Sequence, residues 1–88
     1  MTMLWAWESA APLAAGCGLS DDWRRALRAA SQWMRQHGAD RAVLEEVMLL
    51  SEDAITPLYL PIGSLRALEA YRDQLGRVRW RARQLAAA

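Results

Sequence analysis

Apolar residues recur at helical spacing over three long stretches of the chain. Between residues 21 and 37, seven mostly apolar side chains fall within about 120° of a helical wheel, and arginine and glutamine cover the remainder. The seven are Trp23, Ala26, Leu27, Ala30, Trp33, Met34 and His37. Ser20 is suited to cap such a helix, and Gly38 to end it. The pattern predicts a helix over residues 21–37.

A second apolar side runs through residues 41–55, preceded by Asp40 as a possible cap. Its members are Val43, Leu44, Val47, Met48, Leu50, Ala54 and Ile55, and the polar side carries Arg41, Glu45, Glu46, Glu52 and Asp53. This pattern predicts a second helix over residues 41–55. Thr56-Pro57 ends it, because the residue before a proline disfavours helical geometry. Residues 57–60 fit either one helical turn or an extended connector.

The last third of the chain has the longest apolar seam. Leu65, Leu68, Tyr71, Leu75, Val78, Ala82 and Leu85 recur at spacings of three and four, which is close to a heptad pattern. The seam predicts a helix over residues 65–85 that is long enough to pack against a second copy of the chain. Gly76 interrupts it at a cost of roughly 1 kcal/mol relative to alanine. If the helix breaks there, residues 77–83 alternate arginine with apolar residues and fit a strand. Because no second convincing strand is evident, a helix is preferred.

Residues 2–11 fit two structures. Met3, Trp7 and Ala10 share one helical face, whereas the alternation from Leu4 to Trp7 equally suits a strand. Pro12 and residues 16–18 mark a loop after this segment. Taken together, the patterns predict an all-α fold. We expect one domain over residues 1–88, a small irregular helical bundle of three main helices (21–37, 41–55 and 65–85) plus a short N-terminal element.

Composition narrows the functional classes. All eleven basic residues are arginine, which is typical of a GC-rich bacterial genome. Residues 40–63 hold one arginine against five acids, a charge of −4, and residues 64–88 hold six arginines against two acids, a charge of +4. The acidic segment is therefore expected to lie beside the basic one. Cys17 is the single cysteine, so no internal disulfide forms and a reducing cytoplasm fits.

Membrane targeting is not expected. No apolar run reaches the roughly 18 residues that a membrane span requires. Residues 13–17 match a lipoprotein cleavage box imperfectly, because alanine stands three residues before Cys17. We therefore expect no signal peptide and a cytoplasmic location.

The residues that could carry catalysis are few. Cys17 and His37 are the only candidates for a nucleophile and its base, and no third orienting group is evident. Paired Cys/His spacing for zinc is absent. Adjacent acids such as Glu45 and Glu46 point about 100° apart on a helix, which is poor geometry for shared acid–base work. We expect no enzyme activity, no catalytic residue, no metal site and no cofactor.

Binding is the remaining class, and two interpretations compete. Surplus tryptophans are typical of protein interfaces, so the first is a non-enzymatic bacterial protein-interaction module, an adaptor or small regulator that forms a homodimer through its C-terminal helix. The expected partner-binding residues are Trp5, Trp7, Arg77, Arg79, Trp80, Arg81 and Arg83.

The alternative is nucleic-acid binding through the arginine-rich C-terminal helix, with support from Arg24, Arg25 and Arg28. A helix-turn-helix is not expected, because Glu45 and Glu46 on the second helix would repel phosphates. The arginine ladder, which is Arg77, Arg79, Arg81 and Arg83, by itself more simply orients the seam beside the acidic segment.

Overall fold

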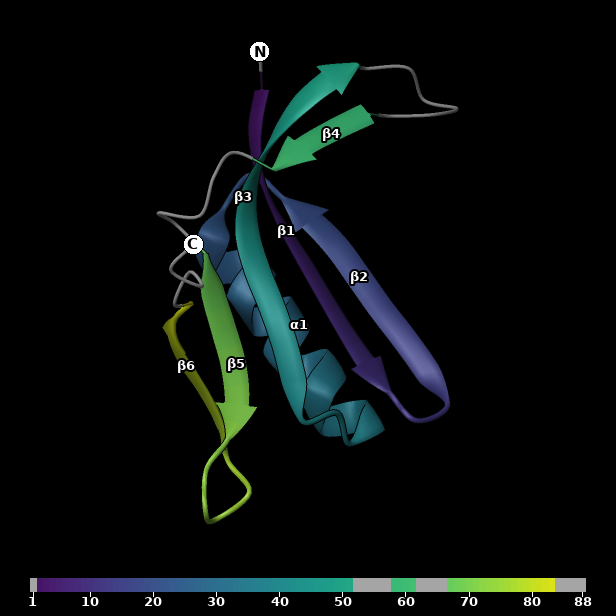
Figure 1. Cartoon of the computed structure of the whole chain (residues 1–88), viewed down its shortest axis with the longest axis vertical. Coiled ribbons are helices and arrows are strands. Elements are labelled where there is room, and N and C mark those ends of the chain that lie inside the picture. Colours follow the sequence, from purple (N-terminus) through teal and green to yellow (C-terminus); the bar gives the residue numbers. More distant parts are fainter. Residues whose placement is uncertain (1, 52–57, 62–66, 84–88) are drawn as a thin grey trace, which may run out of the picture.

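The described part of the chain forms an antiparallel sheet with one helix. The computed structural model describes residues 2–51, 58–61 and 67–83. Along the chain the elements are β1 (Thr2–Ala11), β2 (Ala14–Ser20), α1 (Trp23–His37), β3 (Arg41–Ser51), β4 (Leu58–Pro61), β5 (Leu68–Arg72) and β6 (Val78–Ala82). Figure 1 shows α1 lying behind the strands. The predicted all-α bundle of three helices is therefore wrong, and of its three main helices only the first is present in these described ranges.

Strand β3 lies at the centre of the sheet, whose order is β2-β1-β3-β5-β6. One edge of β3 pairs with β1 along most of its length, with Leu44 opposite Trp7. The other edge is shared between two strands, since β5 pairs with its first residues and β4 with its last. β2 and β6 are the outer strands, and the connection from β2 through α1 to β3 passes over β1.

The predicted helix over residues 41–55 is a strand as far as Ser51, and residues 52–57 lie outside the described part of the chain. A central strand buries side chains on both faces, so its apolar residues do not alternate cleanly with polar ones. Leu44 faces α1, while Val43 and Val47 lie on the opposite face. The apolar pairs Val43-Leu44 and Val47-Met48 therefore stand four residues apart in the sequence, and this spacing resembles the apolar stripe of a helix. The segment 57–60, left open as a turn or connector, includes most of β4.

The predicted helix over residues 65–85 is a β-hairpin in its described part. β5 and β6 are joined by a turn in which the Gly76 N–H donates to the Asp73 carbonyl oxygen (2.9 Å). Gly76 has φ 77°, a left-handed conformation that other residues adopt at a cost. The strand alternative for residues 77–83 was therefore correct, and the missing partner strand is β5. Leu75, expected in the seam, lies at the turn and is 74% exposed.

Residues 2–11 form β1, which resolves the N-terminal ambiguity in favour of a strand. The helix over 21–37 is confirmed as α1, although Asp22 rather than Ser20 is its N-cap. The Asp22 side chain accepts a hydrogen bond from the Arg24 N–H (2.9 Å), and Gly38 closes the other end with φ 67°.

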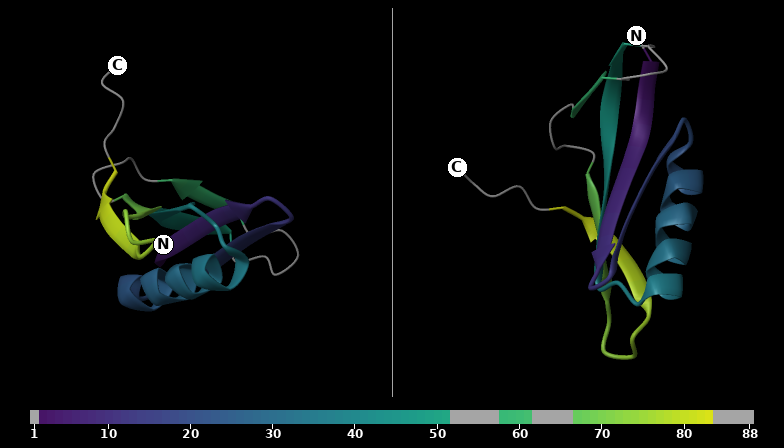
Figure 2. Two further views of the ribbon diagram at one scale, coloured as in Figure 1. Left: turned by 90° about the horizontal axis from the view of Figure 1, so that it is seen from below. Right: turned by 90° about the vertical axis from the view of Figure 1, so that its right-hand side faces the viewer.

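The core lies between α1 and one face of the sheet. Its buried members are Trp7, Ala26, Ala30, Met34, Ala39, Ala42, Leu44 and Ala70. Ala26, Ala30 and Met34 follow one another at intervals of four, so they form a single stripe on the helix. Figure 2 shows the helix as one layer and the strands as another. Among tryptophans of α1, Trp33 packs against the core, but Trp23 is 43% exposed, contrary to its expected place in the stripe.

The glycines of β2 allow two indole rings to lie directly on its backbone. A Cβ added to Gly16 would stand 2.3 Å from Trp33 Cε2, and one added to Gly18 would stand 2.4 Å from Trp7 Nε1. Neither distance is compatible with a side chain at the glycine. The sequence around Cys17, expected to be a loop, is a strand, and its glycines leave room for the Trp33 and Trp7 rings of the core to pack against its backbone.

Candidate functional site

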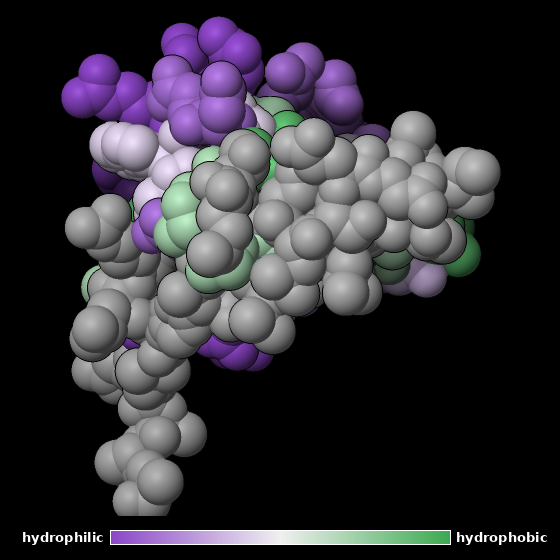
Figure 3. All heavy atoms as spheres, turned by 90° about the horizontal axis from the view of Figure 1, so that it is seen from above, coloured by the Kyte–Doolittle hydropathy of each residue, from purple (hydrophilic) through white to green (hydrophobic). Residues whose placement is uncertain are grey.

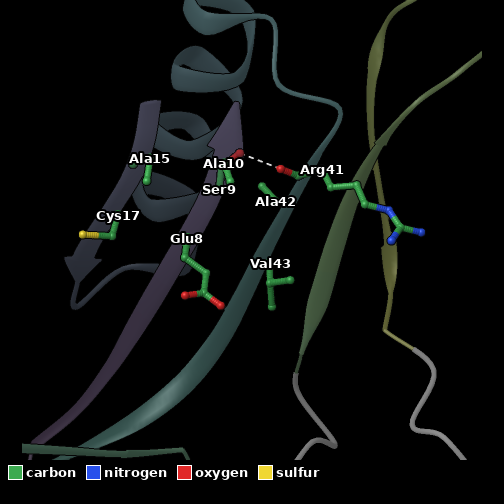
Figure 4. Close-up of a pocket in the computed structure, with 9 residues that line it drawn as sticks. Glu8, Ser9, Ala10, Ala15, Cys17, Arg41, Ala42 and Val43 are labelled. Atoms are coloured by element: carbon green, nitrogen blue, oxygen red, sulfur yellow. Dashed lines mark hydrogen bonds between the residues drawn. The ribbon is translucent and has the colours of Figure 1, made fainter. Parts of the chain in front are cut away.

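The face of the sheet opposite α1 carries a shallow hollow. Because side chains alternate along a strand, Glu8 and Ala10 of β1 point away from the face that holds Trp7 and Ser9. The hollow measures about 510 Å³. It is lined by Glu8, Ser9, Ala10, Ala15, Gly16, Cys17, Arg41, Ala42 and Val43, which are drawn in Figure 4 and all labelled there except Gly16. Small residues on three adjacent strands leave this space.

A second hollow of about 310 Å³ continues the first along the same strands. The two share Glu8, Cys17 and Val43, and the second adds the half-exposed Leu19 and the partly buried Glu45. Together these residues define what we call the open face. Its floor is mostly apolar and its charged groups are Glu8, Arg41 and Glu45.

Glu8 and Arg41 are close in the sheet but do not pair. Glu8 stands opposite Val43 in the register, and Arg41 lies two residues before Val43 on β3. Figure 4 shows the Glu8 carboxylate and the Arg41 guanidinium pointing apart, with the arginine directed toward β5 and β6. Within the described part of the chain neither side chain has an ion-pair partner. The Ser9 hydroxyl donates to the Arg41 carbonyl oxygen (2.5 Å), which fixes the backbone beneath them.

The three tryptophans expected at a partner surface lie on the α1 side of the sheet. Trp7 is 9% exposed and belongs to the core, and Trp5 and Trp80 are half-buried against it. Trp80 Nε1 also donates to Ser31 Oγ (2.9 Å), which ties β6 to α1. These contacts give each ring a packing role in the fold. Their role in partner binding stays a prediction.

The four arginines of the expected ladder are exposed on and beside β6. Arg77 and Arg79 both pair with Asp73 (3.0 and 3.2 Å), and Arg81 pairs with Glu69 (2.8 Å). The Arg81 guanidinium also lies 4.5 Å from the centroid of the Tyr71 ring. Arg83 is exposed at the end of the strand. The ion-pair partners of the ladder thus come from the neighbouring strand and turn. The expected partners were Glu45, Glu46, Glu52 and Asp53: Glu45 lines the open face, Glu46 stands opposite Trp5 in the register, and Glu52 and Asp53 lie outside the described residues.

The hairpin turn is organised by the Asp73 carboxylate. The backbone N–H of Arg77 contributes most to lowering the pKa of Asp73 from 3.8 to about 2; partial burial opposes this shift, and the guanidinium groups of Arg79 and Arg77 and the Leu75 N–H reinforce it. Asp73 Oδ1 accepts from both backbone groups at 2.9 Å. The Asp73 carboxylate therefore stabilises the turn through its backbone hydrogen bonds and partly neutralises the charges of Arg77 and Arg79.

Cys17 and His37 do not come together. Cys17 is exposed on the open face, whereas the His37 ring stacks on Trp33 of α1, with ring centroids 4.3 Å apart. The sheet lies between them, so they do not form a nucleophile–base pair. In the part of the chain that the structure describes, no group of three or more Cys, His, Asp or Glu side chains could hold a metal ion.

Sequence reasoning missed the open face altogether. Its residues fell in the undecided segment 2–11, in a predicted loop and in the predicted helix 41–55, and Glu8, Arg41 and Val43 were not identified as a group. The usable signal was the two-residue alternation in β1, which puts Trp5 and Trp7 on one side and Glu8 on the other.

Comparison with known proteins gives no relative. No protein-family model matches the chain, and no significant match is found among the curated proteins or the solved structures. Among the described residues, no helix is both long and apolar enough to cross a lipid bilayer.

Proposed function

We propose that this chain is a non-enzymatic protein-interaction module that pairs with a second copy of itself through the open face. The observation that carries the proposal is an apolar hollow bordered by Glu8 and Arg41, opposite charges without partners in the described chain. On composition, we place it in a bacterial cytoplasm as an adaptor or small regulator.

A two-fold axis makes these charges complementary. In a symmetric dimer the same patch contacts itself, so Glu8 of one copy reaches Arg41 of the other and the reverse contact occurs as well. Each pair would lie at the border of an apolar contact formed by Ala10, Ala15 and Val43. Complementary charges of this kind fix register and orientation, and the apolar area supplies most of the association energy. The contact replaces the C-terminal helix that the sequence suggested for dimerisation, because residues 67–83 contain the β5–β6 hairpin instead.

Charge reversal tests the arrangement. Glu8→Arg and Arg41→Glu are each expected to shift the protein from dimer to monomer in sedimentation equilibrium, since each places like charges opposite one another. The double variant restores the opposite pairing and should recover the dimer. Arg28→Glu, at an exposed position on α1, is the matched control and leaves association unchanged.

Two results contradict the proposal. One is a strictly monomeric wild-type protein at roughly 1 mM, where even an association of about −4 kcal/mol would be half complete. The other is a double variant that stays as monomeric as the single variants, which would show that the two charges do not meet across the dimer axis.

A further inference from the structure

The outer side of α1 is a basic surface on the opposite side of the sheet from the open face. The helix contains four arginines and no acidic residue, so no ion pair forms along it. All four arginines are exposed. In Figure 3 strongly hydrophilic side chains gather on the side of the molecule where α1 lies. Because no acid at i+4 balances these arginines within the helix, they are available to an external anion.

The arginines form a row rather than a cluster. Arg24, Arg28 and Arg35 are separated by four and seven residues, which places them along one stripe of the helix. At 1.5 Å per residue the row is roughly 16 Å long. Within the described residues, none of the three has an ion-pair partner. A row of this length can contact several consecutive phosphates along one nucleic-acid strand.

The row ends in a cavity. At the C-terminal end of α1, a hollow of about 500 Å³ is lined by Arg35, Arg72, Gly76, Arg77, Val78 and Arg79. Arg72 is held in place by hydrogen bonds to the carbonyl oxygens of Ala39 (3.1 Å), Gly76 (2.8 Å) and Met34 (2.9 Å). These use three of the five N–H donors of its guanidinium and leave two for a ligand. Asp73 offsets part of the charge, but four arginines border this space.

An exposed indole stands at the other end of the row. Trp23 is 43% exposed, and the Arg24 guanidinium lies 5.5 Å from its ring centroid. A tryptophan face beside an arginine is a platform on which an unpaired base can stack, and such stacking contributes about 1–3 kcal/mol per base in other proteins. Duplex bases are already stacked and cannot use this platform. The aromatic ring therefore favours a single strand over a duplex.

We propose that single-stranded nucleic acid binds along this track, with its phosphates on Arg24, Arg28 and Arg35, one phosphate in the cavity beside Arg77, and a base on Trp23. The track shares only Arg77 and Arg79, which line the cavity, with the expected ladder. Arg81 is paired with Glu69 on the other side of the sheet and takes no part. It is also independent of the open face, so a dimer could bind one strand on each outer side.

Salt dependence measures the number of phosphates held. Fluorescence anisotropy with a labelled oligothymidine gives affinities from 50 to 200 mM salt. Four contacts predict a slope of about −2.8 in log affinity against log salt, a loss of about 50-fold over this range. The Arg28→Ala/Arg35→Ala variant should lose only about 7-fold over the same range, because two contacts remain, and should bind more weakly at 50 mM.

The matched control removes the same charge elsewhere. Arg81→Ala/Arg83→Ala should keep the wild-type slope, and thermal unfolding of both variants confirms that they fold. Trp23→Ala should weaken the single strand while leaving the salt slope unchanged, since stacking involves no counterion release.

Several outcomes overturn the proposal. No binding at 50 mM salt rejects it outright, and so does an unchanged slope in the Arg28/Arg35 variant. A duplex that binds as tightly as the single strand removes the role assigned to Trp23. Complete competition by inorganic pyrophosphate at low concentration would show a local anion site instead, and tighter binding to anionic vesicles would show a membrane surface.

Discussion

Replacing Gly16 by alanine tests whether the seat of the Trp33 ring on β2 holds the helix to the sheet. The new Cβ would stand 2.3 Å from Trp33 Cε2, 2.5 Å from Nε1 and 2.7 Å from Cδ2. Ordinary contact for such atoms is 3.4–4 Å, so the ring must retreat by about 1 Å or more. The ring has little freedom to do so, because it stacks on His37 and lies 6.4 Å from Trp7 between centroids. Either β2 moves away from α1 or Trp33 leaves its rotamer.

Overpacking of this kind costs about 1–3 kcal/mol. For a domain of this size each kcal/mol lowers Tm by about 4–8 °C, so the expected decrease is about 4–24 °C. The helical signal in far-ultraviolet circular dichroism, recorded during heating, follows the unfolding of α1 and measures this decrease in Tm. Cys17→Ala is the matched control, since Cys17 is exposed on the other face of the same strand and its change should leave Tm within about 2 °C.

A second background isolates the contact. In a Trp33→Leu protein the ring that alanine would strike is absent, so Gly16→Ala should cost at most about 0.5 kcal/mol there. An equal cost in both backgrounds would refute the reasoning, because the destabilisation would then come from the strand itself rather than from the Trp33 contact. An unchanged Tm for Gly16→Ala in the wild-type background would refute it as well.

Three further predictions concern the β5–β6 hairpin and its tie to α1. Asp73→Asn should lower Tm at pH 7. Because the folded-state pKa of Asp73 is depressed from 3.8 to about 2, the difference from wild type should shrink as the pH falls below about 4 and disappear below about 2; a difference that does not shrink between pH about 4 and about 2 would contradict this. Gly76→Ala should destabilise by about 1–2 kcal/mol, measured by urea unfolding, because φ is 77° there and the surrounding space is open. Ser31→Ala removes the acceptor for Trp80 Nε1 at 2.9 Å and should cost about 1 kcal/mol, with a shift in tryptophan emission that a purely local effect on α1 would not produce.

Helix α1 was predictable because its apolar stripe, its caps and its length agree with one another. Gly38 and the residues at intervals of four were identified correctly, and Trp23 was misplaced only because it lies at the first turn. The structure of residues 2–11 could not be decided from the sequence. Trp7 fits the apolar face of a helix and also the apolar face of an alternating strand, so it does not distinguish the two.

The rest of the sheet was not predictable from periodicity. β3 is apolar on both faces, so Val43 and Leu44 lie on opposite sides of the sheet while appearing as neighbours on a helical stripe. The hairpin had a local signal in Asp73 and Gly76, because aspartate at the first position and glycine at the fourth are typical of a type I turn. That signal was outweighed by the apparent seam, two members of which, Leu75 and Tyr71, turned out not to share a face with Val78.

The candidate site depends on register, which sequence alone does not specify here. Glu8 and Arg41 become neighbours only because Glu8 pairs with Val43 across β1 and β3. A shift of one residue would move Arg41 to the α1 side. The basic row on α1, in contrast, follows from helical spacing, and Arg24 and Arg28 were already suggested as support for nucleic-acid binding.

The central place of β3 also has a consequence for the time course of folding. The β1–β2 and β5–β6 hairpins and α1 each form from residues that are neighbours in the chain, whereas β3 must find β1 on one edge and β5 and β4 on the other. Pairings between distant segments are slow, because the entropy of closing the intervening loops is lost before any contact compensates for it. Docking of β3 is therefore the expected slow event. Stopped-flow refolding should show it as a folding rate that falls when the middle of β3 is destabilised, while changes in either hairpin mainly accelerate unfolding.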